Sequence, residues 1–127
     1  MNNSRSMADC APPGWHNVTP RLVVRDARKL VTFLRDAFGA SGAYEIGRPT
    51  VLHIGDSIVM ISDTSARRAT HALLYLYVDD ADAVYDRALA AGATSIEAPV
   101  DTPYGDRRAM ITDPCGNDWQ IATYRAE

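Results

Sequence analysis

The chain contains two copies of one sequence pattern, and this internal repeat constrains its architecture more than any other feature. Residues 18–40 and 71–93 each place a short apolar run before an Asp, followed by an amphipathic pattern that stops at Gly-Ala. The Asp and the Gly are 13 positions apart in the first copy (Asp26, Gly39) and 12 in the second (Asp80, Gly92). Each copy must bury an apolar face against the other, so we expect two packed modules with a cleft between them.

Each copy predicts a strand, then a helix, then two or three further strands. Val18–Val24 is rich in β-branched residues, and Asp26 is placed to cap the helix that follows it. His71–Val78 repeats the strand, and either Asp79 or Asp80 caps the helix that follows it. Later strands are predicted at Thr50–Ile54, Ile58–Ile61, Arg107–Thr112 and Trp119–Tyr124. If the weaker segments Ala43–Ile46 and Ser95–Ala98 (ended by Pro99) are also strands, the fold is α+β with two βαβββ modules.

The length and composition are those of one ordinary globular domain. With 127 residues, 46% of them hydrophobic and 23% charged, the chain can form a substantial core. We expect a single domain at residues 17–125, with modules at 17–63 and 70–125. Residues 1–16 are polar and rich in proline, which predicts a poorly ordered tail.

Charge and hydropathy exclude several classes of function. A net charge of −3 without a basic block argues against a nucleic-acid partner, and the Arg67-Arg68 pair is interpreted as solvated. No apolar stretch is long enough to span a membrane, and the start of the chain does not resemble a secretory signal. Two cysteines, Cys10 and Cys115, do not suggest a disulfide framework. We therefore expect a cytoplasmic protein.

Four segments carry a resemblance to a known family: VTPRLVVRDA followed by AFGA, IGDSIVMISD, YVDDADAVYDRALAAGA and YGDRRAMITDPCGNDWQI. Their order and spacing resemble the vicinal oxygen chelate superfamily, which includes glyoxalase I, extradiol dioxygenases and the bleomycin- and fosfomycin-resistance proteins. The segment Tyr104–Trp119 resembles the PhnB-type, glyoxalase-like branch. The resemblance covers about residues 17–125. It implies two βαβββ modules whose mixed sheet curls around an open cleft, and a second subunit, so we expect a homodimer.

The resemblance also indicates where a metal ion would be held. In metal-dependent members, His, Gln or Glu side chains from equivalent strands face one ion. The corresponding positions here are Thr19, Leu73, Gln120 and either Val59 or Met60. Leu, Val and Met offer no hard donor, and a Thr–Gln pair alone is a poor divalent site. We therefore expect no metal ion and no other cofactor.

Strand alternation predicts which side chains face the cleft. The six predicted ligand-binding residues are Arg21, His53, Met60, His71, Tyr75 and Gln120. Tyr75 would provide stacking area, Arg21 would bind an anionic or carbonyl group, and Gln120 would both donate and accept hydrogen bonds. In the alternative interpretation, Arg21 pairs with an acid, His71 faces solvent and Tyr75 fills space between the modules. Trp119 is assigned to the core.

Three functions remain open at this stage. The first is a metal-free protein that binds a small organic compound, partly aromatic or antibiotic-like, in the cleft. The second is an enzyme (a lyase, isomerase or dioxygenase) with an atypical metal site formed by His53, His71 and Gln120. A metal-free catalyst that uses His71 or Arg21 is a variant of the second. The third is a subunit with a vestigial cleft that acts only in assembly.

Overall fold

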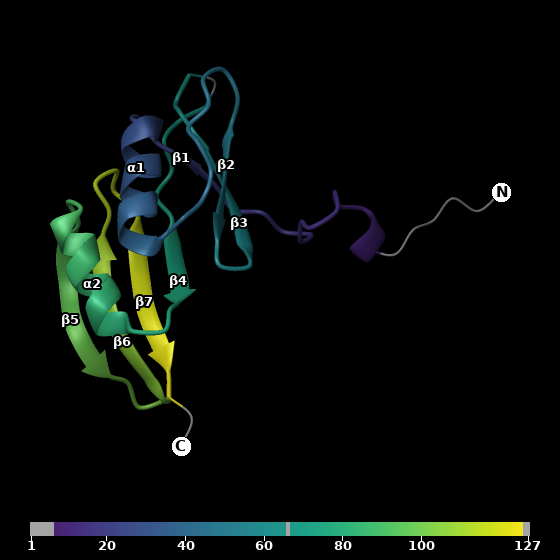
Figure 1. The fold of residues 1–127 in the computed structure, drawn as a ribbon. Helices are drawn as coiled ribbons and strands as arrows, with labels where there is room; N and C mark the ends of the chain where they lie inside the picture. Colours follow the sequence, from purple (N-terminus) through teal and green to yellow (C-terminus); the bar gives the residue numbers. More distant parts are fainter. Residues whose placement is uncertain (1–6, 66, 126–127) are drawn as a thin grey trace.

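The computed structural model describes residues 7–65 and 67–125, whose strands form two open mixed sheets (Figure 1). The first module contains β1 (Arg21–Val23), α1 (Ala27–Phe38), β2 (Thr50–Ile54) and β3 (Ser57–Ser62). The second contains β4 (Leu73–Tyr77), α2 (Ala81–Ala90), β5 (Thr94–Asp101), β6 (Asp106–Thr112) and β7 (Asp118–Tyr124). The segment before β1 extends away from both sheets and includes a short 3-10 helix, Met7–Asp9.

The two sheets share one arrangement of three strands, as the repeat predicts, and the second sheet has β5 as an additional edge strand. The three-stranded sheet has the order β1-β3-β2, and the four-stranded sheet has the order β4-β7-β6-β5. In each module the first strand runs parallel to the last strand, which also pairs antiparallel with the strand before it. The α+β class and the repeated module are therefore confirmed.

One predicted strand of the first module is absent. Residues 43–46 form no ladder, and the only pairing near them among the described residues is an isolated bridge between Ser41 and His53. Two glycines with positive φ, Gly42 at 126° and Gly47 at 82°, flank the segment and turn the backbone out of an extended path. The backbone N–H of Glu45 instead donates to the Thr50 hydroxyl, 2.9 Å away.

Pro99 does not end the fifth strand, contrary to the sequence-based expectation. β5 continues through it to Asp101, with register shifts between Ser95 and Glu97 and between Glu97 and Val100. Proline is tolerated here because β5 is an edge strand, where a missing N–H need not break a ladder.

The helices begin where the sequence predicts and pack together over one shared core (Figure 1). The carboxylates of Asp26 and Asp80 each accept a first-turn backbone N–H at 3.1 Å. Phe38 is the last residue of α1, and the centroid of its ring lies 4.9 Å from the ring centroid of Trp119 in the second module. Trp119 is only 3% exposed and donates its indole N–H to Asp113, so its assignment to the core is confirmed. Neither helix within the described residues is long and apolar enough to cross a membrane.

Candidate functional site

The face of the four-stranded sheet turned away from the helices is aromatic and polar. Along β4, Leu73, Tyr75 and Tyr77 are exposed, whereas the residues between them pack toward the core, as strand alternation predicts. Tyr75 lies beside Gln120 in the parallel register of β4 and β7, and Gln120 lies beside Met110 in turn. This row places ring, amide and thioether groups on one surface.

A buried carboxylate holds the two tyrosines. Asp106, only 3% exposed at the start of β6, accepts the Tyr75 hydroxyl at 2.6 Å and the Tyr77 hydroxyl at 2.9 Å through the same Oδ2 atom. Its own backbone N–H donates to the Thr102 hydroxyl at 3.0 Å. The two rings are held with centroids 5.2 Å apart and planes tilted by 48°. The rings are therefore oriented before any ligand arrives.

Both tyrosines keep their protons under ordinary conditions. Burial, followed by the hydrogen bond to Asp106, raises the pKa of the Tyr75 hydroxyl above its usual value. The hydrogen bond to Asp106 is the main cause that raises the pKa of Tyr77. Each hydroxyl consequently remains a donor to the carboxylate well above neutral pH.

Arg108 adds a cation to the same face. Its Nη1 donates to the Tyr104 hydroxyl at 2.7 Å, and its Nη2 lies 3.1 Å from a Glu97 carboxylate oxygen. The Glu97 contact is the main cause that raises the pKa of the Arg108 guanidinium. The Nε of Arg108 is buried and has no hydrogen-bond partner among the described residues. One donor of this network is therefore unsatisfied.

A cavity of about 410 Å³ lies between the two modules. Tyr75 and Tyr77 of β4 line one side, and residues 54–57 at the β2–β3 turn line the other. Phe38 of α1, Arg87 of α2 and Asp79, which follows β4, also line it. Arg87 is positioned by its Nε, which donates to the Ala37 carbonyl at the end of α1, 3.3 Å away. The cavity is thus mixed in character, with apolar, aromatic and charged walls.

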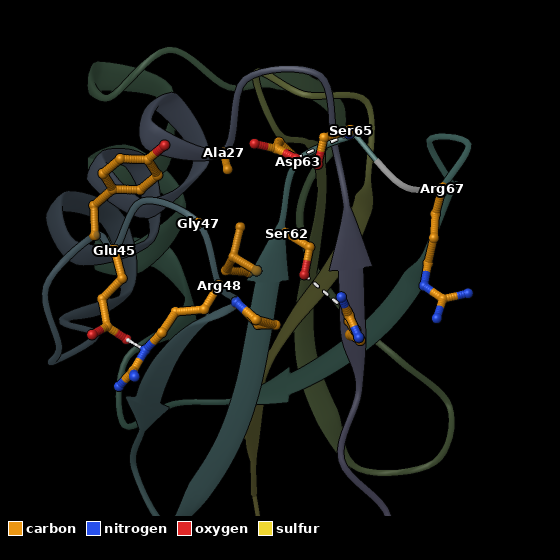
Figure 2. Close-up of a pocket in the computed structure, with 12 residues that line it drawn as sticks. Ala27, Glu45, Gly47, Arg48, Ser62, Asp63, Ser65 and Arg67 are labelled. Atoms are coloured by element: carbon orange, nitrogen blue, oxygen red, sulfur yellow. Dashed lines mark hydrogen bonds and ion pairs between the residues drawn. The ribbon is translucent and has the colours of Figure 1, made fainter.

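A smaller cavity, of about 200 Å³, lies in the first module (Figure 2). Arg21 of β1 lines it and donates from Nε to the Ser62 hydroxyl at 2.8 Å. Arg48 also lines it and is paired with Glu45 at 3.3 Å, as the dashed line in Figure 2 shows. The walls of this cavity combine charged side chains with the apolar surfaces of Ala27, Pro49 and Ile61.

The six residues predicted to bind ligand fall into two groups, one on each sheet. Arg21 pairs in register with Met60, and His53 lies on the neighbouring edge strand β2, where it is exposed. On the other sheet, Tyr75 is adjacent to Gln120. Arg21 and Tyr75 line different cavities. The side-chain partner of Arg21 is a hydroxyl, not the acid considered as the alternative.

His71 precedes β4 and is exposed, with its Nε2 3.2 Å from the Asp118 carboxylate. Sequence reasoning missed both Asp118 and Asp106 as partners of the predicted site. Each reaches its partner across strands: Asp118 is the register neighbour of Leu73, and Asp106 lies two strands from β4. Only the strand order reveals these contacts, because residue spacing along the chain carries no sign of them.

The register also resolves which residue occupies the fourth chelating position. Arg21 and Tyr75 are repeat-equivalent, and they pair with Met60 and Gln120 respectively, so Met60 rather than Val59 is the counterpart of Gln120. Within the described part of the chain, no group of three or more His, Cys, Asp or Glu residues is arranged to hold a metal ion.

Comparison with known proteins identifies the family. Residues 16–121 match the model of the Glyoxalase/Bleomycin resistance protein/Dioxygenase superfamily. An uncharacterised protein of Mycobacterium bovis is 31% identical over 122 residues, covering 82% of this chain and 80% of the relative. An uncharacterised protein of Mycobacterium tuberculosis has the same identity, with 72% of its length covered. The chain belongs to this superfamily, and the resemblance seen in the sequence is confirmed at that level.

Solved structures agree with this assignment. TioX from Micromonospora sp. ML1 superposes with a TM-score of 0.72 at 27% identity, covering 84% of this chain and 97% of TioX. The fosfomycin resistance protein FosX from Mesorhizobium loti superposes with a TM-score of 0.64 at 24% identity, covering 84% and 89% of the two chains. The second likeness establishes the fold alone. The PhnB-type branch remains a prediction.

Proposed function

We propose that the protein binds a small organic ligand, without a divalent metal ion, in the cavity between its two modules. The observation that carries this proposal is the pair Tyr75 and Tyr77, which line that cavity while buried Asp106 fixes both hydroxyls. Rings that are already oriented lose little conformational freedom when a ligand stacks on them.

The size and lining of the cavity suit an organic molecule. Its volume of about 410 Å³ falls within the range of small-molecule sites, roughly 300–1,000 Å³. Phe38 and Ile54 offer apolar contact, and Arg87, Asp56 and Asp79 offer charge. A partly aromatic or antibiotic-like compound fits this combination. The superfamily's inclusion of bleomycin resistance proteins supports the same class of ligand.

The donor set supports a metal-free site. The four chelating positions hold Thr19, Met60, Leu73 and Gln120. Only Thr and Gln provide oxygen and neither is charged, whereas metal-dependent members of the superfamily hold the ion with two or three His, Gln or Glu ligands. The residues present do not fit such an ion.

The alternative is an enzyme of the lyase, isomerase or dioxygenase type. The contact between His71 and Asp118 favours it, because a carboxylate beside an imidazole can orient it for proton transfer. His53 lies on the other sheet, so a metal site formed with His71 and Gln120 would need groups from both modules. We consider binding the better-supported function.

We also propose that the working form is a cytoplasmic homodimer. Leu73 of the four-stranded sheet is 67% exposed, and such an exposed apolar side chain favours a covering partner. Symmetric pairing of two copies is the common solution.

A ligand screen tests the proposal. Aromatic and glycopeptide-like compounds are screened by thermal shift, and hits are titrated into wild type, Tyr77→Ala and the control Tyr124→Ala. Tyr124 is an exposed tyrosine on the same sheet that does not line the cavity. We expect about tenfold weaker binding in Tyr77→Ala, as loss of stacking area predicts, and little change in the control. Equal affinity in all three proteins would place the ligand elsewhere.

A further inference from the structure

The near-neutral charge of the whole chain conceals a strong asymmetry between its modules. Residues 17–70 contain eight Lys and Arg against five Asp and Glu, whereas residues 71–125 contain four against nine. The first module taken together with the linker that follows it is therefore basic, and the second module is acidic. A local excess of one sign attracts small ions of the other sign even when the protein's net charge does not.

Five arginines of the first module and the linker after it gather around two neighbouring hollows. Arg21, Arg48 and Arg67 line the cavity of about 200 Å³. Arg67 also lines an adjacent hollow of about 590 Å³, together with Arg25 and Arg68. The sequence alone suggests that the Arg67-Arg68 pair is merely solvated. In the structure it lies beside Arg21, Arg25 and Arg48, which come from earlier parts of the chain.

Most of this positive charge is not neutralised by the protein. Arg48 is paired with Glu45, and Arg21 uses only its Nε, toward Ser62. Within residues 7–65 and 67–125, the side chains of Arg25, Arg67 and Arg68 form no hydrogen bond or ion pair. Their guanidinium donors, and the terminal nitrogens of Arg21, are therefore available to a ligand.

Two carboxylates share the lining of the smaller cavity, and both are engaged locally. Glu45 is the partner of Arg48. Asp63 accepts the backbone N–H of Ser65 at 3.0 Å, and hydrogen bonding by Ser65 lowers the pKa of the Asp63 carboxyl. Figure 2 shows Asp63 and Ser65 together at one end of the cavity and Glu45 and Arg48 together at another. Counting both hollows, five guanidinium groups face two carboxylates.

We propose that this cavity is an anion-binding site, distinct from the cavity between the modules, which takes the carboxylate or phosphate group of a small molecule. Arg21 and Arg67 are the anchors, because each brings unused donors to the lining. Guanidinium groups bind both carboxylate and phosphate through paired, charge-assisted hydrogen bonds. Ser62 holds Arg21 in place, while Arg25 and Arg68 add attraction from the adjacent hollow. The volume restricts the occupant to a small anion or the charged end of a longer molecule.

The test is calorimetric titration of the full chain at low ionic strength, with inorganic phosphate and with succinate in separate experiments. The variants are Arg21→Gln and Arg67→Gln. Arg125→Gln is the matched control, since it removes the same charge from the second module, where Arg125 contacts Asp101 at 3.4 Å. We expect about tenfold weaker binding in Arg21→Gln and in Arg67→Gln, as loss of a charge-assisted hydrogen bond predicts, and less than about twofold change in the control.

The two titrants identify which anionic group the site prefers. Saturable binding of either one that weakens in both Arg21→Gln and Arg67→Gln supports the site. Absence of saturable binding of both titrants to wild type would overturn the proposal, as would equal weakening in Arg125→Gln. Arg67→Gln removes no protein contact among the described residues, so it keeps the test informative if Arg21→Gln unfolds.

Discussion

The hydroxyl of Tyr75 donates to Oδ2 of Asp106 across 2.6 Å, and this contact joins β4 to β6 over the intervening strand β7. Asp106 is nearly inaccessible to solvent, so its charge is compensated by protein groups instead of water. The contact is therefore both a structural link across the sheet and the support for the ring that faces the proposed ligand.

Replacing Asp106 should destabilise the fold more than replacing an exposed acid. Asp106→Ala removes the acceptor and leaves the Tyr75 hydroxyl without its partner, so we expect a loss of about 2 kcal/mol in the free energy of unfolding. Asp101→Ala is the control, because that side chain is 67% exposed, and it should cost less than about 0.5 kcal/mol. Urea denaturation measures both. Equal losses would show that the Tyr75–Asp106 contact contributes little.

Stability should also fall at alkaline pH because of Tyr75. Its pKa is raised in the folded protein, whereas an unfolded tyrosine ionises near pH 10, at about its ordinary pKa. The unfolded chain therefore loses this proton first, so the stabilisation is complete below about pH 10 and declines as the pH rises above that value. Wild type should lose more stability than Tyr75→Phe between pH 9 and pH 11 in urea denaturation. Parallel pH profiles of the two proteins would contradict this assignment.

Gly42 should be the least replaceable glycine of the first module. A Cβ at this position would lie 2.6 Å from the Val51 carbonyl oxygen, and the residue has a φ of 126°. Gly47, with a φ of 82° and no atom within 4 Å of an added Cβ, is the control for backbone strain alone. We expect losses of about 3 kcal/mol for Gly42→Ala and about 1 kcal/mol for Gly47→Ala. Thermal and urea denaturation measure the difference. Similar losses in the two variants would show that the backbone near Val51 shifts readily to accommodate the added methyl group.

The predicted homodimer is tested by light scattering at micromolar concentration. We expect twice the chain mass, 13.9 kDa per copy. Leu73→Asp, which places charge on the exposed face of β4, should shift the population toward monomer if that face is the contact. A wild-type monomer would contradict the prediction. A dimer unaffected by Leu73→Asp would show that the subunit interface lies on another surface.

Local patterns in the sequence were sufficient to predict both α-helices and most of the strands. Asp26 marked the start of the first helix and the pair Asp79 and Asp80 that of the second, where the structure places the cap at Asp80. Alternation along β4 correctly separated the exposed tyrosines from the half-buried positions. These features depend on neighbours within a few residues. The absent strand near Tyr44 was mispredicted, because the pattern of side chains does not reveal how the flanking glycines turn the backbone.

The arrangement of the site depends on long-range geometry that no local pattern contains. Alternation assigned Arg21 and Tyr75 to a common face, but the strands belong to separate sheets and the two residues line different cavities. The partner of Tyr75, Asp106, is 31 positions away and becomes a neighbour only through the order of the strands. Register within the sheets, in turn, decided that Met60 is equivalent to Gln120.

We expect the protein to bind an organic ligand between its modules without a metal ion. The most direct measurement is calorimetric titration of a screening hit into protein treated with EDTA, compared with untreated protein and with protein supplied with zinc, nickel, manganese or iron. We predict the same affinity and stoichiometry in every case, with near-zero metal content after purification without chelator. Loss of binding on EDTA treatment, together with one bound metal ion that disappears in His71→Ala, would contradict the account and favour the enzyme.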